Sequence, residues 1–189
     1  MGNTPLGKLM IKKIEQMNLI NIDALRIKTT IDIYFEWKQL DAKVRTLSTR
    51  GLNFPSELSE NFACYALGYM LNKGKGGDAY DSKRKRIIEM KASSSERDSA
   101  PSSFSPKEEF DELVFIKLNR EEDAVYIYLT GHSSEDIKQI EVNKNETLEQ
   151  QQAKGRRPRF SIIDKIIKPL GLTPDVKFDM REKTVQKLK

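Results

Sequence analysis

The chain has 189 residues, of which 38% are hydrophobic and 32% charged, with a formal net charge of +5. This predicts one soluble domain with its own core, and no apolar run approaches the roughly 18 residues that a membrane span needs. Lysines interrupt the apolar pattern of the N-terminus, unlike that of a secretory signal, so a cytoplasmic protein is expected. Cys64 and His132 are single residues of their types, which excludes zinc frameworks built from several such ligands.

Helices are predicted in the N-terminal part, the first a short one within residues 8–17. A long amphipathic helix starting near Asp23 is predicted by apolar residues that recur at steps of three and four: Ile27, Ile31, Tyr34, Trp37, Leu40, Val44 and Leu47. Ser56 is expected to cap a further helix. Its apolar stripe is Leu58, Phe62, Tyr65 and Tyr69, and its expected end is at Gly74, Gly76 and Gly77. Cys64 in this helix is interpreted as a small buried hydrophobe, with a Cys–His nucleophilic pair as the alternative.

Three strands are predicted next, from short runs of apolar, β-branched and aromatic residues at 86–92, 112–118 and 124–131. A hairpin turn is expected at Asn119–Asp123, and Ser93–Pro106 is the most loop-like stretch because Ser and Pro dominate it. After Gly131 the chain is predicted to turn helical through residues 145–154. A basic loop, a short helix from about Ser161 and a breaker at Pro169 follow.

The order helices, strands, helices favours an α/β fold with a mixed central β-sheet flanked by α-helices. We expect one domain over residues 1–189. Its parts are N-terminal helices at 1–73, a sheet core at 74–131 and a basic region at 132–189.

The basic excess lies near the C-terminus. Residues 154–189 carry a formal charge of +7, whereas residues 1–153 carry −2. This indicates an anionic partner engaged from one side, with nucleic acid ahead of membrane, and a solvated basic tail as the alternative.

Asp78, Glu89 and Lys91 form the pattern with the clearest chemistry. Residues 89 and 91 leave the same face of a strand, and a hairpin across residues 81–85 would bring Asp78 near Glu89. Two converging carboxylates repel unless a cation joins them, and Mg²⁺ suits such a pair. A lysine beside that metal can position an attacking water, act as a base or stabilise charge on the transition state. The pattern predicts metal-dependent phosphodiester hydrolysis, with a hairpin carrying a surface ion pair as the alternative.

The segments GGDAYDSKRKRIIEMKASS, EEFDELVFIKLNREEDAVYIYL and GRRPRFSI, in this order, resemble a small type II restriction endonuclease of the PD-(D/E)xK class. The similarity is to the subgroup that cleaves G-C-N-G-C, and it spans about Asp32 to Leu170. The resemblance implies a restriction-endonuclease-like sheet, Mg²⁺ bound by Asp78 and Glu89, and Lys91 acting at the attacking water. Gly77 stands where the class has proline.

The resemblance also implies an acid from a preceding helix. Glu60 is the candidate metal ligand there, with Glu57 competing for the role. A solvated helix carboxylate is the alternative, and the number of metal ions stays open.

DNA contacts are expected from three regions. Arg156, Arg157 and Arg159 can each bond guanine O6 and N7, worth about 1–3 kcal/mol of discrimination, and at least one of the three should contact phosphate instead. Ser93 and Ser94 follow the catalytic strand and could touch DNA near the scissile phosphate. Lys83 and Arg84, with Lys85 and Arg86, are expected in a backbone-facing or solvated turn.

A short palindromic, G/C-rich target implies a homodimer. The long helix over Asp23–Ser48 is the first place to look for its interface, although the stripe could instead pack on the protein's own sheet. A cognate DNA methyltransferase is implied by the resemblance alone. The rival functions are a structure-selective or repair nuclease of the same fold and a noncatalytic DNA-binding protein.

Overall fold

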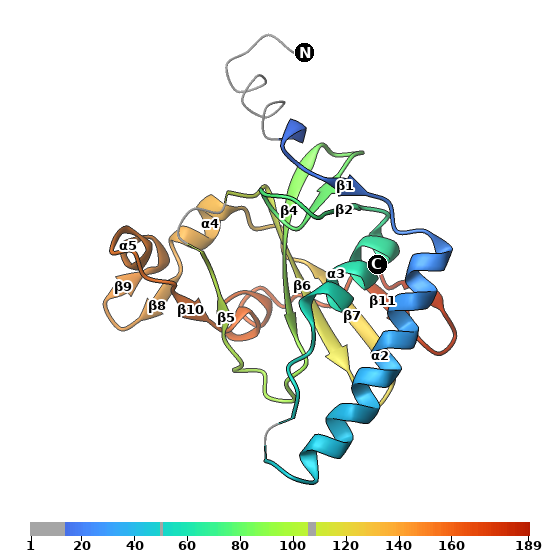
Figure 1. Ribbon diagram of the computed structural model, residues 1–189. Coiled ribbons are helices and arrows are strands. Elements are labelled where there is room, and N and C mark those ends of the chain that lie inside the picture. The colour runs from blue at the N-terminus through green and yellow to red at the C-terminus, as the bar shows by residue number, and fades with distance from the viewer. Residues whose placement is uncertain (1–13, 50, 106–108) are drawn as a thin grey trace.

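A mixed β-sheet forms the centre of the protein in the computed structural model, which describes residues 14–49, 51–105 and 109–189 (Figure 1). Over these ranges the sheet has eight strands in the order β1-β2-β3-β4-β6-β7-β11-β12. Their bounds are β1 Leu19–Ile20, β2 Met70–Asn72, β3 Ala79–Asp81, β4 Arg86–Ser93, β6 Glu112–Asn119, β7 Ala124–Leu129, β11 Val176–Asp179 and β12 Thr184–Lys187. Only the β4–β6 pair is parallel; the others in this sheet are antiparallel. The predicted mixed α/β architecture and its three central strands are confirmed.

Two helices cover one face of this sheet. They are α2 (Ala24–Arg45) and α3 (Ser56–Leu67), and they pack against the β4 side chains Ile88 and Met90. The predicted start of the long helix is confirmed, because the Asp23 side chain caps α2 by accepting a 2.7 Å hydrogen bond from the Arg26 N–H.

The opposite face packs against the C-terminal region, where Ile87 and Leu113 of the sheet join a second apolar core. This region contains α4 (Ser134–Lys138), β8 (Glu141–Asn143), β9 (Glu146–Thr147), α5 (Leu148–Ala153), β10 (Arg159–Phe160) and the π-helix η1 (Ile163–Ile167). The short strand β5 (Ser102–Ser103) pairs with β10. In Figure 1 this group lies on one side of the sheet and α2 on the other.

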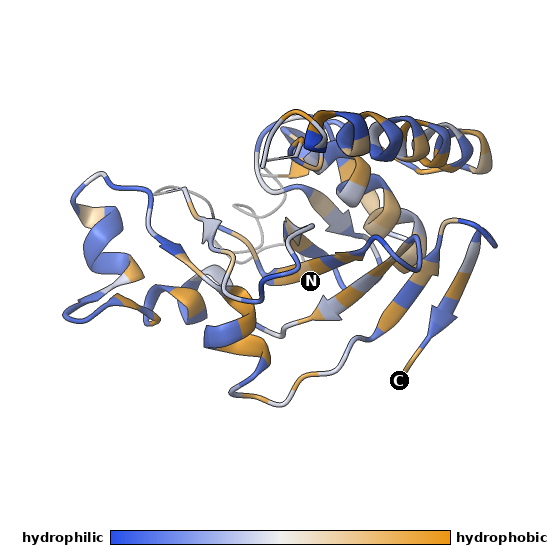
Figure 2. Ribbon diagram, turned by 90° about the horizontal axis from the view of Figure 1, so that it is seen from below, coloured by the Kyte–Doolittle hydropathy of each residue, from blue (hydrophilic) through white to orange (hydrophobic). Residues whose placement is uncertain are grey.

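The predicted apolar stripe is buried only as far as Trp37. Ile27, Tyr34 and Trp37 lie in the core, whereas Leu40 is 54% exposed, and Leu47, in the turn after α2, is 89% exposed. The C-terminal end of α2 reaches beyond the strands (Figure 1), so its last turns have no sheet to cover. Figure 2 shows apolar and polar residues alternating around this helix.

The predicted boundaries of the next helix are wrong. Ser56 is the first helical residue of α3, not its cap; Pro55 occupies the cap position and makes no side-chain hydrogen bond there. The helix ends at Gly68, whose φ of 69° is left-handed, and not at the later glycines. This earlier stop frees residues 70–72 to form β2 inside the sheet. The short helix expected within residues 8–17 lies largely outside the described residues.

The C-terminal part also contains strands that the predicted order lacks. The β11–β12 hairpin extends the sheet beyond β7, and β8 pairs with β9 ahead of α5. In β11, buried Val176 and Phe178 alternate with more exposed Lys177 and Asp179, which is the period of a strand with one buried face. In the described part of the chain, no helix has the length and hydropathy needed to cross a membrane.

Candidate active site

The β3–β4 hairpin brings the two predicted carboxylates together. Its register pairs Ala79 with Ile88, so Asp78, one step before Ala79, stands across from Glu89. The Asp78 N–H donates to the Ile88 carbonyl at 2.8 Å, and Asp78 Oδ2 accepts from the Met90 N–H at 2.7 Å. These two bonds fix both the backbone and the carboxylate of Asp78 against β4.

Glu89 and Lys91 leave the same face of β4 and form an ion pair. Glu89 is 2% exposed, and the Lys91 ammonium donates to Glu89 Oε1. Burial of a charged carboxylate costs desolvation free energy, and the ion pair with an ammonium offsets that cost. The sequence-predicted trio Asp78, Glu89 and Lys91 is therefore assembled on one hairpin.

Glu60 approaches the trio from α3. Burial, followed by the negative charges of Asp78 and Glu57, raises the pKa of Glu60 to about 7, against the opposing effects of a Ser56 hydrogen bond and the Lys91 charge. Glu57 is exposed on the same helix, so Glu60 is the better-placed acid of the two. Burial is the main cause of the raised pKa of Glu60, and a nearby cation would offset the smaller contribution of the two negative charges.

Cys64, one turn along α3, is an inert neighbour of this cluster. Its thiol is buried, and burial, followed by the charges of Glu60 and Asp78, raises its pKa. A thiolate is thus disfavoured, which agrees with the interpretation as a buried hydrophobe.

The donor set suits a hard cation. Among the described residues no group of three or more His, Cys, Asp and Glu side chains is arranged to hold a metal ion. Mg²⁺ needs fewer protein ligands, since one or two carboxylates, water and substrate phosphate oxygens complete its shell. The hairpin register sets Asp78 across from Glu89, and the negative charge of Asp78 acts on Glu60.

The glycine in place of proline before Asp78 has a backbone cause. Gly77 has φ +77°, and a side-chain carbon there would lie 2.5 Å from Cγ2 of Ile87. Proline holds φ near about −65° and could not adopt this turn.

Asn72 organises the loop that leads to Asp78, and the sequence analysis missed it. It is 8% exposed. Its amide donates to the carbonyls of Lys75 and Gly77 at 3.1 and 2.8 Å, and its Oδ1 accepts from the N–H groups of Asn18 and Gly74 at 3.0 and 2.9 Å. An asparagine before a glycine-rich loop carries no sequence signal that separates this role from an ordinary turn.

The arginine loop, which carries Arg156, Arg157 and Arg159, lies beside the segment that follows β4. β10 pairs antiparallel with β5, so that Arg159 stands across from Ser103, and the Phe104 N–H donates to the Pro158 carbonyl at 3.1 Å. Arg156, Arg157 and Arg159 are exposed. These contacts hold the loop next to the segment that leaves β4.

The basic turn after β3 contains side chains in two different settings. Arg84 is engaged within the protein, since its guanidinium pairs with Asp81 and with Glu112 and donates to the Tyr69 hydroxyl. Lys83 is exposed. A DNA contact from Arg84 would have to compete with these partners, whereas one from Lys83 would not.

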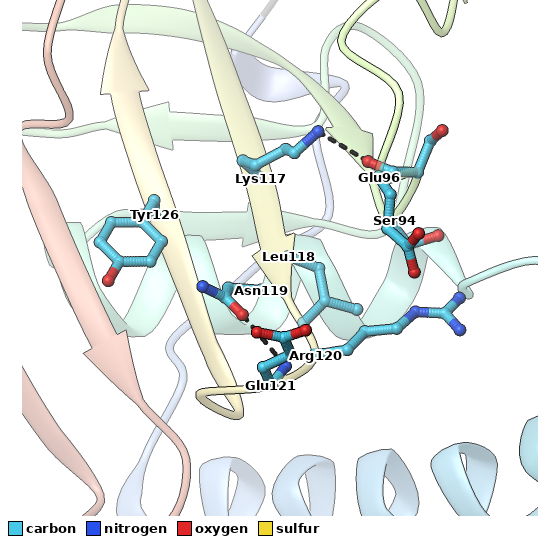
Figure 3. Close-up of a pocket in the computed structure, with 9 residues that line it drawn as sticks. Ser94, Glu96, Lys117, Leu118, Asn119, Arg120, Glu121 and Tyr126 are labelled. Atoms are coloured by element: carbon cyan, nitrogen blue, oxygen red, sulfur yellow. Dashed lines mark hydrogen bonds between the residues drawn. The ribbon is translucent and has the colours of Figure 1, made fainter.

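Ser93 and Ser94 lie at the end of β4, beside a pocket. Ser93 stands across from Lys117 of the parallel strand β6, and Ser94 lines the pocket together with Lys117, Asn119 and Tyr126 (Figure 3). Lys117 donates to the Ser95 carbonyl at 2.6 Å. Lys117 was not predicted, although its charge within the apolar run of residues 112–118 is the same signal that pointed to Lys91.

Known proteins resemble this chain over most of its length. Residues 22–169 match the family model of the Bsp6I restriction endonuclease. A type II restriction enzyme, Bsp6I from Bacillus sp. (strain RFL6), is 46% identical over 172 residues, which cover 90% of this chain and 98% of the relative. No solved structure gave a significant match. The matched region contains the whole charged cluster and the arginine loop, and the chain belongs to the Bsp6I restriction endonuclease family.

Proposed function

We propose that this protein is a type II restriction endonuclease of the PD-(D/E)xK class, which hydrolyses both strands of a short palindromic, G/C-rich DNA site with Mg²⁺. The observation that carries the proposal is the β3–β4 hairpin, which sets Asp78 across from Glu89 and places Lys91 on the Glu89 face. Family membership supports the class of substrate. By the resemblance in sequence, G-C-N-G-C is the first site to test.

Each residue of the cluster has a distinct role in this reaction. Asp78 and Glu89 would hold Mg²⁺, with Glu60 as the additional ligand, and the bound ion would stabilise charge on the phosphate and lower the pKa of the attacking water. The Lys91 ammonium, bonded to Glu89, orients that water and offsets negative charge as the water oxygen bonds to phosphorus and the ester P–O bond breaks. The attacking water gives up one proton to solvent, and the departing oxygen takes one proton from solvent.

Recognition is assigned to the exposed arginines of the loop ahead of and within β10. Arginine binds guanine O6 and N7 in bidentate fashion, which suits a G/C-rich site. Ser93 and Ser94 are assigned to the DNA backbone near the cleaved bond, and Lys83 to the DNA backbone at another point. The position of Ser93 and Ser94 at the end of β4, the strand of Lys91, supports the first assignment, and the exposure of Lys83 in the turn before β4 supports the second.

Cleavage of a palindrome on both strands calls for two equivalent active sites, and a twofold dimer supplies them. The exposed apolar residues Leu25, Ile33 and Leu40 of α2 recur at steps of seven or eight, so they line one side of the helix, and exposed Leu47 follows in the turn after it. We assign this stripe to the homodimer interface. A methyltransferase that protects the host's own sites is the partner implied by this function.

The test is digestion of a sequenced plasmid in Mg²⁺, with EDTA and the Glu89→Ala protein as controls. Discrete fragments that vanish in both controls are expected, and sequencing of their ends gives the site. A smear would indicate a structure-selective or nonspecific nuclease. Intact plasmid in several divalent metals would refute an enzymatic function and favour a noncatalytic DNA-binding protein.

A further inference from the structure

Two buried aromatic rings join the segment that follows β4, the strand of Lys91, to the arginine loop. The rings of Phe104 and Phe160 stack with centroids 4.8 Å apart and planes 7° from parallel, and both are buried. Phe104 directly follows β5, and Phe160 lies in β10 next to Arg159. The two strands pair with each other, so the backbone bonds and the ring stack join the same two segments.

The same Phe104 ring contacts the catalytic lysine. Lys91 Nζ lies 5.6 Å from the centroid of the Phe104 ring, within the range at which the ring's electrons attract a cation. Lys91 thus has two anchors, the Glu89 carboxylate on its own strand and an aromatic ring that belongs to the recognition side. The Phe104 side chain therefore contacts both Lys91, which is assigned to catalysis, and Phe160 of β10, the strand assigned to base recognition.

We propose that Phe104 is a positioning residue that couples recognition of the correct bases to the placement of Lys91. This inference rests on the proposed function. When Arg156, Arg157 and Arg159 engage the cognate bases, β10 is fixed, the Phe160 ring fixes Phe104, and Phe104 holds the ammonium of Lys91 over the attacked phosphate. On a near-cognate site the arginines engage incompletely, β10 is not fixed, and the lysine loses one anchor.

If Phe104 were only a core residue, its replacement would lower stability without changing the placement of Lys91. Phe110 provides the matched control for that case. Phe110 is buried in the same apolar cluster as Phe104 and Phe160, but it is not a member of the stack. Phe110→Leu should therefore lower stability by a similar amount without acting on the lysine.

The experiment measures kcat and KM for Phe104→Leu, Phe160→Leu and Phe110→Leu on a cognate duplex and on one with a single base pair changed, with thermal unfolding of each. Phe104→Leu should reduce kcat on the cognate duplex by about 5- to 30-fold, the equivalent of one cation–π contact. KM and binding in Ca²⁺ should stay within about twofold. Cleavage of the altered duplex should fall less, so that selectivity shrinks.

Phe160→Leu breaks the stack without touching Lys91, and it should reproduce the effect of Phe104→Leu. The double variant should match either single variant, because both act through one unit. Equal losses on both duplexes, or a Phe104→Leu protein that behaves like Phe110→Leu, would overturn the inference while leaving the nuclease intact. A wild-type protein that cuts no DNA overturns the proposed function and this inference with it.

Discussion

Replacement of Glu60 by glutamine should stabilise the metal-free protein above neutral pH while impairing cleavage. Burial and the charges of Asp78 and Glu57 raise the Glu60 pKa from 4.5 to about 7. The folded state then binds this proton more tightly than the unfolded state, so the stability contributed by the neutral carboxyl is lost as pH rises from about 4.5 to 7. Glutamine is neutral throughout and avoids that loss.

The pKa values bound the size of the effect. The difference between 4.5 and about 7 corresponds to about 3 kcal/mol. Solvent screens this partly exposed carboxyl, which reduces the expected gain to about 1–2 kcal/mol. For a chain of this size that gain raises Tm by about 2–8 °C.

Thermal unfolding in EDTA at pH 5 and pH 8.5 tests this reasoning. The exposed Glu36 on α2 supplies the matched control. Glu36→Gln should leave the Tm unchanged at both pH values. Glu60→Gln should match the wild type at pH 5 and exceed it at pH 8.5, and added Mg²⁺ should stabilise the wild type more than the variant. No difference at pH 8.5, or an equal gain at both pH values, would refute the electrostatic account.

Four further outcomes are expected. Glu89→Ala and Lys91→Ala should abolish cleavage but keep most DNA affinity in Ca²⁺, measured by gel shift; wild-type cleavage by either contradicts the assigned roles. Arg157→Ala should weaken cognate binding more than nonspecific binding, whereas an equal loss in both makes it a phosphate contact. Asn72→Ala removes the hydrogen bonds that hold the loop ahead of Asp78 and should cost about 1–3 kcal/mol in urea unfolding, together with a lower kcat; unchanged stability argues against its role. Leu40→Asp should convert a dimer to a monomer in sedimentation, and an unchanged mass removes α2 from the interface.

The sequence alone was sufficient for features that depend on near neighbours. The central strands follow from apolar runs of fixed period, and Asp23 lies at the start of a helical stripe that its side chain caps. Asp78, Glu89 and Lys91 could be grouped because a tight turn brings residues about ten apart into register. The cost of placing charges within an apolar strand marked Glu89 and Lys91.

Features that depend on distant contacts were decided by the tertiary structure. The true end of α3 was missed because several glycines could terminate the helix. The helix ends at Gly68 because the residues that follow form β2 in the sheet. The α2 stripe was overextended because periodicity does not say how far the sheet beneath a helix reaches. The β11–β12 hairpin has weak local signals and gains its stability from pairing with β7.

The candidate site also has parts that the sequence predicted and parts that depend on the tertiary structure. Local pattern was enough to group Asp78, Glu89 and Lys91, because hairpin register is a short-range property. Only the fold decided three further contacts. Glu60 lies near the charge of Asp78, Asn72 bonds to the loop ahead of Asp78, and Phe104 contacts Lys91 and stacks on the ring next to Arg159. Each of these contacts joins segments separated along the chain, and the packing of both faces of the sheet, rather than any repeat in the residues, brings them together.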